Sequence, residues 1–415
     1  MEHINISNYN EWAKNHIFDD NKFDDNGFII MENDTNYKST GIIANILEDH
    51  FDFYYDKYKD VLDRLRPNAY DEVQKIINCH NHNLGATVYV CDACDEVIYS
   101  HHTCKGRLCS SCGIKTQKIV TENILQTCIN SKHRHITFTI PNDLTMWFFK
   151  DLYSTNLLFE AVSDTIYSII NGKVKKNKIS KYSLKYKPAF FSFLHTFGRS
   201  LNFNPHIHVI IAEYIMDKSG NIKKYNYFNY DALSKRFMKI LLDKMSKYFG
   251  KKEFYNTKNK MYFKYPNGFY VNNRLEDDDI TFNSLEELIK YVTRYCARPC
   301  MAESRIINYD GENVAFFYVD HKTKEYIEIT VSAFKFIGML LRHLLPSNFK
   351  SIRSYGFYNK KHKISDKIKL LVSKEKRNIR KDFLKWRNLI ALSFKRIPIS
   401  CPICSKIMVP IFEVS

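Results

Sequence analysis

The chain has 415 residues and is 45% hydrophobic and 26% charged, a composition that is typical of folded domains and excludes a disordered protein. Its 62 Lys and Arg residues against 45 Asp and Glu residues give a net charge of +17, which favours a polyanion such as nucleic acid as partner. It contains no apolar run of about 18 residues, so we expect no membrane association. The N-terminus lacks the features of a secretory signal. We therefore expect a cytoplasmic protein of two or three domains.

The charge is distributed unevenly from one end of the chain to the other. Residues 1–60 contain 13 Asp and Glu residues and 5 Lys and Arg residues, whereas residues 341–400 contain 3 and 17. The acidic lead, residues 1–75, includes a predicted helix over Ile42–Leu65. A bias in codon usage explains the abundance of lysine but not its clustering, so the basic segment is the expected site of nucleic-acid binding.

Six of the eleven cysteines fall within residues 79–112. Cys91 and Cys94 form one Cys-x-x-Cys pair, and Cys109 and Cys112 form a second pair that is separated from the first by 14 residues. Two such pairs supply the four thiolates of a tetrahedral zinc site, so we expect these four residues to bind a structural Zn²⁺. Buried free thiols are the alternative. The identity of the four ligands stays open, because three further candidates lie close by in the sequence: Cys104, Cys79 and His82.

Strand and helix patterns alternate through the rest of the chain and indicate an α+β fold. Strands are predicted over residues 135–140, 189–197 and 206–212. Helices are predicted over residues 115–130, 231–249 and 284–298, and a further helical pattern follows the first strand and continues to about residue 171. Residues 316–331 are predicted to form a strand pair. The basic region from residue 333 is predicted to be rich in helix and to end in a small element with Cys401 and Cys404.

Of the three His-x-His pairs in the chain, only His206 and His208 flank a large apolar residue and precede an apolar run. Alternate residues of a β-strand share a face, so both imidazoles point to one side while Ile207 enters the core. Such a pair suits a divalent ion that polarises a phosphate, although an exposed histidine pair is an equal alternative. If the strands over residues 190–197 and 206–212 form a hairpin symmetric about residues 201–202, His195 lies opposite His208 and can be a third ligand. A histidine that packs in the core is the alternative.

A helix is predicted to begin at Ser284, because Ser284 and Glu287 form a capping box. Its buried stripe consists of Leu285, Leu288, Ile289, Val292 and Cys296. Tyr291 and Tyr295 are four residues apart, hence neighbours beside this stripe, and Arg298 extends the same flank. A tyrosine hydroxyl can act as the nucleophile of covalent catalysis on phosphate, although tyrosine pairs with this spacing also arise by chance in so tyrosine-rich a chain.

Together and in this order, these motifs resemble the insertion-sequence-ninety-one family of rolling-circle, two-tyrosine transposases, whose nuclease belongs to the HUH superfamily. The similarity extends from about Cys79 to the C-terminus. It rests on residues 84–94 and 103–112 for the zinc module, 135–141 for the first nuclease strand, 194–198 and 204–208 for the metal motif, 291–295 for the nucleophile helix, and 341–346 and 352–357 for the C-terminal region.

The resemblance implies an HUH-type nuclease domain with a central antiparallel sheet and flanking helices, preceded by a small zinc-binding module. We therefore divide the chain into an acidic lead (1–75), a zinc-binding module (76–130), the nuclease domain (131–332) and a basic, helix-rich DNA-binding region (333–415).

The implied activity is cleavage and rejoining of single-stranded DNA through a 5′-phosphotyrosine on Tyr291 or Tyr295. Mg²⁺ or Mn²⁺ would be held by His206 and His208, with His195 as the third ligand. Expected partners are single-stranded DNA at element ends and target and the host replication machinery of a bacterium; the expected DNA contacts are Arg298, Arg342 and Arg353. Two alternatives stay open, namely a rolling-circle plasmid replication initiator and a non-catalytic, zinc-dependent DNA-binding protein.

Overall fold

The structure is a computed structural model that describes residues 41–80, 82–172, 184–198, 200–272, 284–320, 323, 325–359, 368–394 and 399–414. Most of the acidic lead, residues 1–40, lies outside the described residues. The described chain divides into two compact units, and each combines distant segments: 41–79 with 103–378, and 80–102 with 379–414. The units thus do not follow the four consecutive segments inferred from the sequence.

None of the helices in the described part of the chain is both long and apolar enough to cross a membrane.

A six-stranded sheet organises the larger unit, and every strand pairing in it is antiparallel. The strand order is β11-β4-β5-β3-β7, and β6 pairs with β5. The strands are β3 (His133–Thr139), β4 (Tyr186–Phe197), β5 (Phe203–Asp217), β6 (Ile222–Lys224), β7 (Val271–Asn272) and β11 (Ile352–Gly356). The central strand β5 contains the His-x-His pair, so the strand predicted over residues 206–212 is confirmed.

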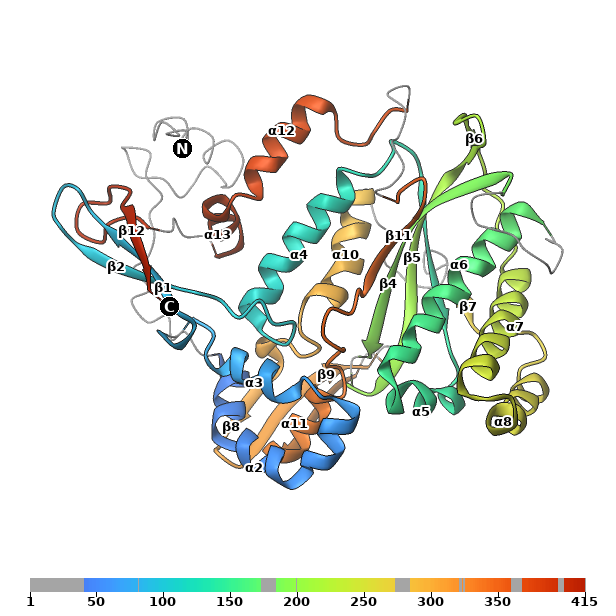
Figure 1. Cartoon of the computed structure of the whole chain (residues 1–415), viewed down its shortest axis with the longest axis horizontal. Helices are drawn as coiled ribbons and strands as arrows, with labels where there is room; N and C mark the ends of the chain where they lie inside the picture. The colour runs from blue at the N-terminus through green and yellow to red at the C-terminus, as the bar shows by residue number, and fades with distance from the viewer. Residues whose placement is uncertain are drawn as a thin grey trace. The chain divides into compact units, whose positions relative to one another are not determined.

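Helices cover both faces of this sheet (Figure 1). One layer contains α5 (Asn142–Lys150), the 3₁₀ turn η2 (Leu152–Thr155), α6 (Asn156–Asn171), α7 (Tyr230–Phe249) and α8 (Lys251–Lys264); α4 (Ser110–Leu125) and α10 (Leu285–Ala297) lie on the other face. The alternation along β5 divides its side chains between two cores. Ile207, Val209 and Ile211 belong to the first core, and Ile210 and Ala212 to the second.

A second structured region of the larger unit packs helices against a three-stranded antiparallel sheet of order β10-β9-β8. Its elements are α2 (Ile42–Leu65), α3 (Ala69–Ile77), the 3₁₀ turn η3 (Glu303–Arg305), β8 (Ile306–Tyr309), β9 (Asn313–Val319), β10 (Tyr326–Ser332) and α11 (Ala333–Leu341). The predicted helix over Ile42–Leu65 and the predicted strand pair are therefore confirmed.

The smaller unit is built on the sheet β12-β1-β2, with strands β1 (Ala86–Val90), β2 (Val97–His101) and β12 (Val409–Val414). It also contains the 3₁₀ turn η1 (His82–Leu84) and helix α13 (Trp386–Phe394), while α12 (Lys374–Phe383) spans the sequence boundary between the units. The basic region from residue 333 consequently does not fold as one helical domain. Its first part, with α11 and β11, belongs to the larger unit, and its end belongs to the smaller one.

Candidate active site and cysteine clusters

Three histidines meet on the face of the central sheet that α4 and α10 cover. His195 on β4 and His206 and His208 on β5 place ring nitrogens within 4.8 Å of one another. The expected pairing of His195 with His208 is wrong, because the register is shifted by two residues and His195 lies opposite His206. A shift by an even number of residues keeps every side chain on its face, and this is why the grouping survives the error in register.

The environment of the three rings fixes their orientation. His195 and His208 are buried, and His206 is half-buried. The Nδ1–H of His206 donates a hydrogen bond of 2.7 Å to the carbonyl oxygen of Asn204, so its Nε2 carries the lone pair that would bind a metal. Hydrogen bonding of one ring nitrogen to the protein is the usual arrangement for a metal-binding histidine, so the residues present fit a divalent ion.

A fourth histidine, His135 on β3, supports His208 from the neighbouring strand. The His135 Nε2 lies 2.7 Å from the His208 Nδ1, the two rings stack with centroids 5.0 Å apart, and the hydroxyl of Thr137 lies 3.2 Å from the same Nδ1. His135 was not assigned to the site from the sequence, although its His-x-His spacing on a predicted strand was a usable indication. Its partner in that pair, His133, instead contacts the hydroxyl of Tyr358.

Helix α10 brings the predicted nucleophile to this face of the sheet. The Ser284 hydroxyl accepts a 3.2 Å hydrogen bond from the N–H of Glu287, as the capping box predicts. The ring of Tyr291 lies edge-on to His135, with centroids 6.4 Å apart. Tyr295 belongs to the same helix, but its side chain lies outside the described residues.

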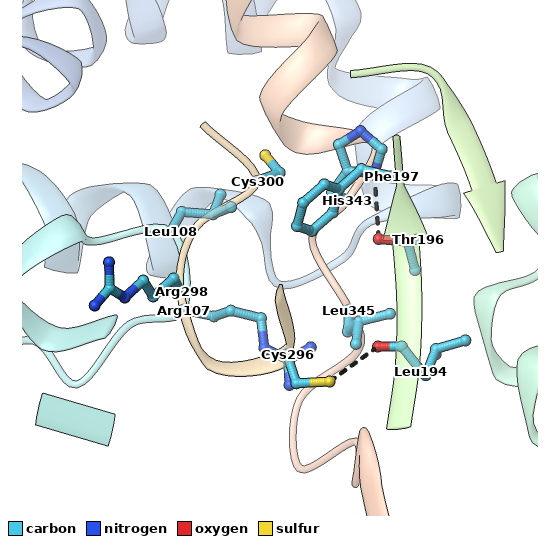
Figure 2. Close-up of a pocket in the computed structure, with 10 residues that line it drawn as sticks. All are labelled: Arg107, Leu108, Leu194, Thr196, Phe197, Cys296, Arg298, Cys300, His343 and Leu345. Carbon is cyan, nitrogen blue, oxygen red and sulfur yellow. Dashed lines mark hydrogen bonds between the residues drawn. The ribbon is translucent and has the colours of Figure 1, made fainter. Parts of the chain in front are cut away.

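The end of α10 also contacts the histidines and lines a small pocket beside them. The Cys296 thiol lies 3.0 Å from the His195 Nε2, and burial raises its pKa. Figure 2 shows Cys296 among the lining residues together with two arginines, Arg107 and Arg298. Arg298 donates a 2.5 Å hydrogen bond to the Gln117 side chain, which holds it against α4. The arginines give the pocket a positive charge next to the histidine cluster.

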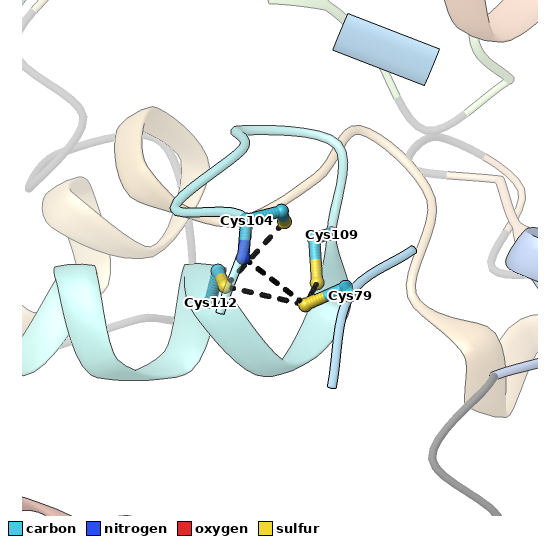
Figure 3. Close-up of side chains that lie close together, drawn as sticks. All are labelled: Cys79, Cys104, Cys109 and Cys112. Carbon is cyan, nitrogen blue, oxygen red and sulfur yellow. Dashed lines mark hydrogen bonds between the residues drawn. The ribbon is translucent and has the colours of Figure 1, made fainter. Parts of the chain in front are cut away.

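The first cysteine cluster lies in the larger unit and joins the end of α3 to the start of α4. The side chains of Cys79, Cys104, Cys109 and Cys112 turn toward one another (Figure 3). The sulfurs of Cys79 and Cys112, of Cys104 and Cys112, and of Cys79 and Cys109 lie 3.6 to 3.8 Å apart. Ligands at about 2.3 Å from a tetrahedral Zn²⁺ are separated by about 3.8 Å, so this cluster fits zinc.

The second cluster lies in the smaller unit and consists of Cys91, Cys94, Cys401 and Cys404. The expected zinc site of Cys91 and Cys94 with Cys109 and Cys112 is therefore wrong, because the two pairs belong to different clusters. The spacing within each pair predicts two ligands but does not determine which other pair completes the site. Cys79 and Cys104, both considered as extra ligands, complete the first cluster. His82 is part of η1, and its side chain lies outside the described residues.

In each cluster, hydrogen bonds favour the thiolate, the form in which cysteine binds zinc, at one of the sulfurs. The contact with Cys104 lowers the pKa of Cys112 to about 6, whereas contacts with the sulfurs of Cys109, Cys112 and Cys79 raise the pKa of Cys104. In the second cluster the backbone N–H of Ala93 lowers the pKa of Cys91 to about 7. One thiolate in each cluster is thus available for a cation at neutral pH.

The two C-terminal arginines expected to contact DNA do not join the histidine cluster. The Arg353 guanidinium lies 4.0 Å from the centroid of the Phe159 ring and donates a hydrogen bond to Asn156. Arg342 donates a 3.4 Å hydrogen bond from Nε to the carbonyl oxygen of Gly338. Both side chains contribute to packing within the larger unit, and their contact with DNA stays a prediction.

The chain is similar in sequence to known transposases. Residues 46–140 match the family model described as "Transposase zinc-binding domain", and residues 189–365 match the model described as "Putative transposase". The "Transposase for insertion sequence element IS801" of Pseudomonas savastanoi pv. phaseolicola is 27% identical to the chain, over 71% of each protein. The "Putative transposase y4qJ" of Sinorhizobium fredii (strain NBRC 101917 / NGR234) is 24% identical, over 69% of this chain and 73% of its own length.

The chain belongs to the insertion-sequence-ninety-one family of transposases. No solved structure matches it. In this transposase the zinc-binding domain contains the whole first cysteine cluster, and the match and the sulfur geometry together support a structural zinc. The "Putative transposase" segment contains the three histidines and α10. Cys401 and Cys404 lie beyond both matched segments.

Proposed function

We propose that the protein catalyses rolling-circle DNA transposition by metal-dependent cleavage and rejoining of single-stranded DNA through a 5′-phosphotyrosine. One observation carries the proposal: His195, His206 and His208 converge on the sheet face that α10 covers, and the ring of Tyr291 on that helix lies next to His135, the hydrogen-bond partner of His208. A set of imidazoles beside a tyrosine is suited to covalent attack on a phosphodiester. The arrangement is consistent with an HUH-type nuclease.

In this proposal His206 and His208, with His195 as the third ligand, hold Mg²⁺ or Mn²⁺. The bound ion would supply Lewis-acid polarisation of the scissile phosphate. The protein contributes orientation: the carbonyl oxygen of Asn204 sets the tautomer of His206, and His135 with Thr137 fixes the ring of His208. These contacts come from the two neighbouring strands β3 and β5, so they would orient the rings before DNA binds.

The Tyr291 hydroxyl would attack the phosphorus atom and lose its proton. A bond forms between the tyrosine oxygen and phosphorus while the bond from phosphorus to the 3′ oxygen breaks, and that oxygen leaves as a hydroxyl by taking up a proton. The phosphotyrosine conserves one phosphodiester bond for each one broken, so a 3′-hydroxyl can later reverse the step without a nucleotide cofactor. Tyr295, one helical turn away on α10, would serve the second strand.

The proposed partners follow from this chemistry. The substrate is single-stranded DNA at the element ends and the target, and the host replication machinery would restore the displaced strand in the bacterial cytoplasm. Basic side chains beside the site, such as Arg107 and Arg298, suit a phosphate backbone. The relatives named above are described as a transposase and a putative transposase, and this favours transposition over plasmid replication initiation, which would use the same chemistry.

The experiment uses single-stranded oligonucleotides that carry the element ends, labelled on either side of the cleaved bond, with Mn²⁺ or with EDTA. We expect a covalent protein–DNA adduct with Mn²⁺ that retains only the label on the 3′ side of the break, because the 5′ phosphate joins the tyrosine. Cleavage without an adduct would indicate hydrolysis, and an adduct with the other label would reverse the polarity. Either result would overturn the proposal, as would an absence of cleavage.

A further inference from the structure

The smaller unit has a small apolar core. Besides the buried Ala86, Val88, Leu389, Ile390 and Ala391, its described residues contain one small buried cluster, namely Tyr89, Cys91, Ile399, Cys401 and Met408. Two of these five side chains are cysteines whose sulfurs belong to the second cluster. Units with so little buried apolar surface usually need a disulfide or a metal ion to fold.

The two Cys-x-x-Cys turns of this unit, residues 91–96 and 401–406, have the same backbone structure although they are some 300 residues apart. In each turn the N–H of the first cysteine donates to the carbonyl five residues later, at 2.9 Å in the first turn and 2.7 Å in the second. The N–H four residues later donates back to the first cysteine at 2.9 Å in both. The residue after the second cysteine is left-handed in both, with φ of 53° at Asp95 and 57° at Ser405.

This repeated turn directs both sulfurs of each pair to one point. Cys94 lies 3.4 Å from Cys91, 3.3 Å from Cys401 and 3.6 Å from Cys404 between sulfur atoms, and Cys91 lies 3.4 Å from Cys404. These separations exceed the disulfide bond length of about 2.05 Å and approach the spacing around a tetrahedral metal ion.

We propose that Cys91, Cys94, Cys401 and Cys404 bind a second zinc ion, which fastens the C-terminal strand to the β1–β2 hairpin. The proposal does not depend on the DNA chemistry proposed above, because it concerns only the smaller unit. Four thiolates in a closed tetrahedral set select a soft ion such as Zn²⁺, and binding releases the remaining thiol protons. The exposed Cys404 gives the ion an entry path.

The strand pairing explains what this ion would accomplish. β1 lies between β2 and β12, and β12 pairs with it from Ala86↔Val414 to Val90↔Val409. The hairpin and β12 are far apart in the sequence, so the zinc would close a loop of about 300 residues. A cross-link that closes a long loop lowers the conformational entropy of the unfolded chain more than one that closes a short loop. A stacked contact of Tyr89 with Trp386 adds the helix α13 to the same assembly.

Metal content of the full-length protein provides the first test. We expect two zinc ions per chain in the wild type and one in the double variant Cys401→Ser/Cys404→Ser. The matched control Cys128→Ala removes a buried cysteine that belongs to neither cluster and should retain two. Two ions in the double variant, one in the wild type, or iron in place of zinc would overturn the proposal.

Hydrogen exchange provides a readout that does not depend on activity or on total metal. In the double variant, the backbone amides of β1 and β12 should exchange at least about 10-fold faster than in the wild type. Without the second zinc ion, β12 should separate from β1 more often. Amides of the central strand β5 should be unchanged, which shows that the larger unit is folded. Equal protection of the β12 amides in the variant and the wild type would contradict the proposal that a zinc ion holds β12 against β1.

Discussion

The two faces of the six-stranded sheet differ in what their side chains do. The face under α5, α6 and α7 is apolar, and along β5 it receives Ile207, Val209 and Ile211. The face under α4 and α10 receives His206 and His208 from the same strand. Because successive residues point to opposite faces, a single strand supplies both the core and the candidate site.

This difference separates stability from chemistry at adjacent positions. The apolar face removes large side chains from water, which stabilises the fold by roughly 25 cal/mol for each Å² buried. The histidine face has an apolar core of its own but also accepts polar groups, and it tolerates them because hydrogen bonds connect them between β3 and β5. Substitution of an apolar core side chain should therefore change stability, whereas substitution of a histidine on the other face should change metal binding and cleavage.

The largest expected effect is on the apolar face, in the variant Phe138→Ala. Phe138 is fully buried and meets Phe237 edge-to-face, with centroids 5.1 Å apart. The cavity should lower the free energy of unfolding by about 3–5 kcal/mol. Urea titration measures this loss, and substitution of the exposed Tyr153 by Ala serves as the control, with little expected change. A loss below about 1 kcal/mol would show that this face does not anchor the fold.

On the histidine face, His206→Ala should reduce single-strand cleavage ~100-fold, equivalent to about 2.7 kcal/mol of transition-state stabilisation. His206 is half-buried, so the free energy of unfolding should change much less than in Phe138→Ala. Cleavage rates in Mn²⁺, compared with urea titration of the same variant, measure both quantities. Normal cleavage combined with a large loss of stability would reverse the assignment of the two faces.

His135→Phe sharpens the comparison, because it keeps an aromatic ring against His208 but removes the 2.7 Å hydrogen bond. We expect Mn²⁺ affinity to fall ~10-fold, since groups that orient a metal ligand contribute about this much. Isothermal titration with Mn²⁺ gives the affinity. The control is His50→Phe, the same substitution in α2, away from the proposed metal ligands, which should leave the affinity unchanged. Unaltered binding in His135→Phe would limit His135 to packing.

The smallest expected effect concerns His343, a buried histidine that is not one of the three proposed metal ligands. Burial lowers its pKa to about 3, and its Nε2–H donates to the carbonyl oxygen of Leu201. The unfolded imidazole binds a proton near pH 6.5, so between pH 6.5 and 3 the unfolded chain holds more protons and stability falls as pH falls. From pH 6.5 to 5.5 the loss from this residue is about 1 kcal/mol.

Denaturation at several pH values tests this in wild type and His343→Gln. In the variant, the free energy of unfolding should fall by about 1 kcal/mol less between pH 6.5 and 5.5 than in the wild type. The variant should retain the pH dependence due to His133, whose pKa is lowered to about 4 by burial. Identical slopes in the two proteins would mean that His343 is not kept neutral by the fold.

Much of the histidine site could be predicted from the sequence because strand alternation is a local property. His206 and His208 share a face whatever the register, and any even shift leaves His195 with them. The register itself was predicted wrongly, because it depends on the connection, where Leu201 is left-handed with φ of 60°, and on a bulge between His195 and Phe197. His135 was not assigned, since nothing local indicates that β3 pairs with β5.

The composition of the cysteine clusters could be predicted only in part from local sequence. The Cys-x-x-Cys spacing correctly predicts that Cys91 and Cys94 act together, but their partners Cys401 and Cys404 lie at the far end of the chain. Only the pairing of β12 with β1 brings them close, and pairing between distant strands is a tertiary property.

The central claim is that a tyrosine of α10 attacks DNA held at the histidine face. The most direct measurement is covalent adduct formation with labelled single-stranded element ends in Mn²⁺, comparing Tyr291→Phe, Tyr295→Phe and the double variant with Tyr227→Phe, an exposed tyrosine that serves as control. Each change removes only a hydroxyl. The account predicts no adduct in the double variant, impaired strand transfer in each single variant and a normal adduct in the control. An adduct in the double variant would place the nucleophile elsewhere and contradict the account.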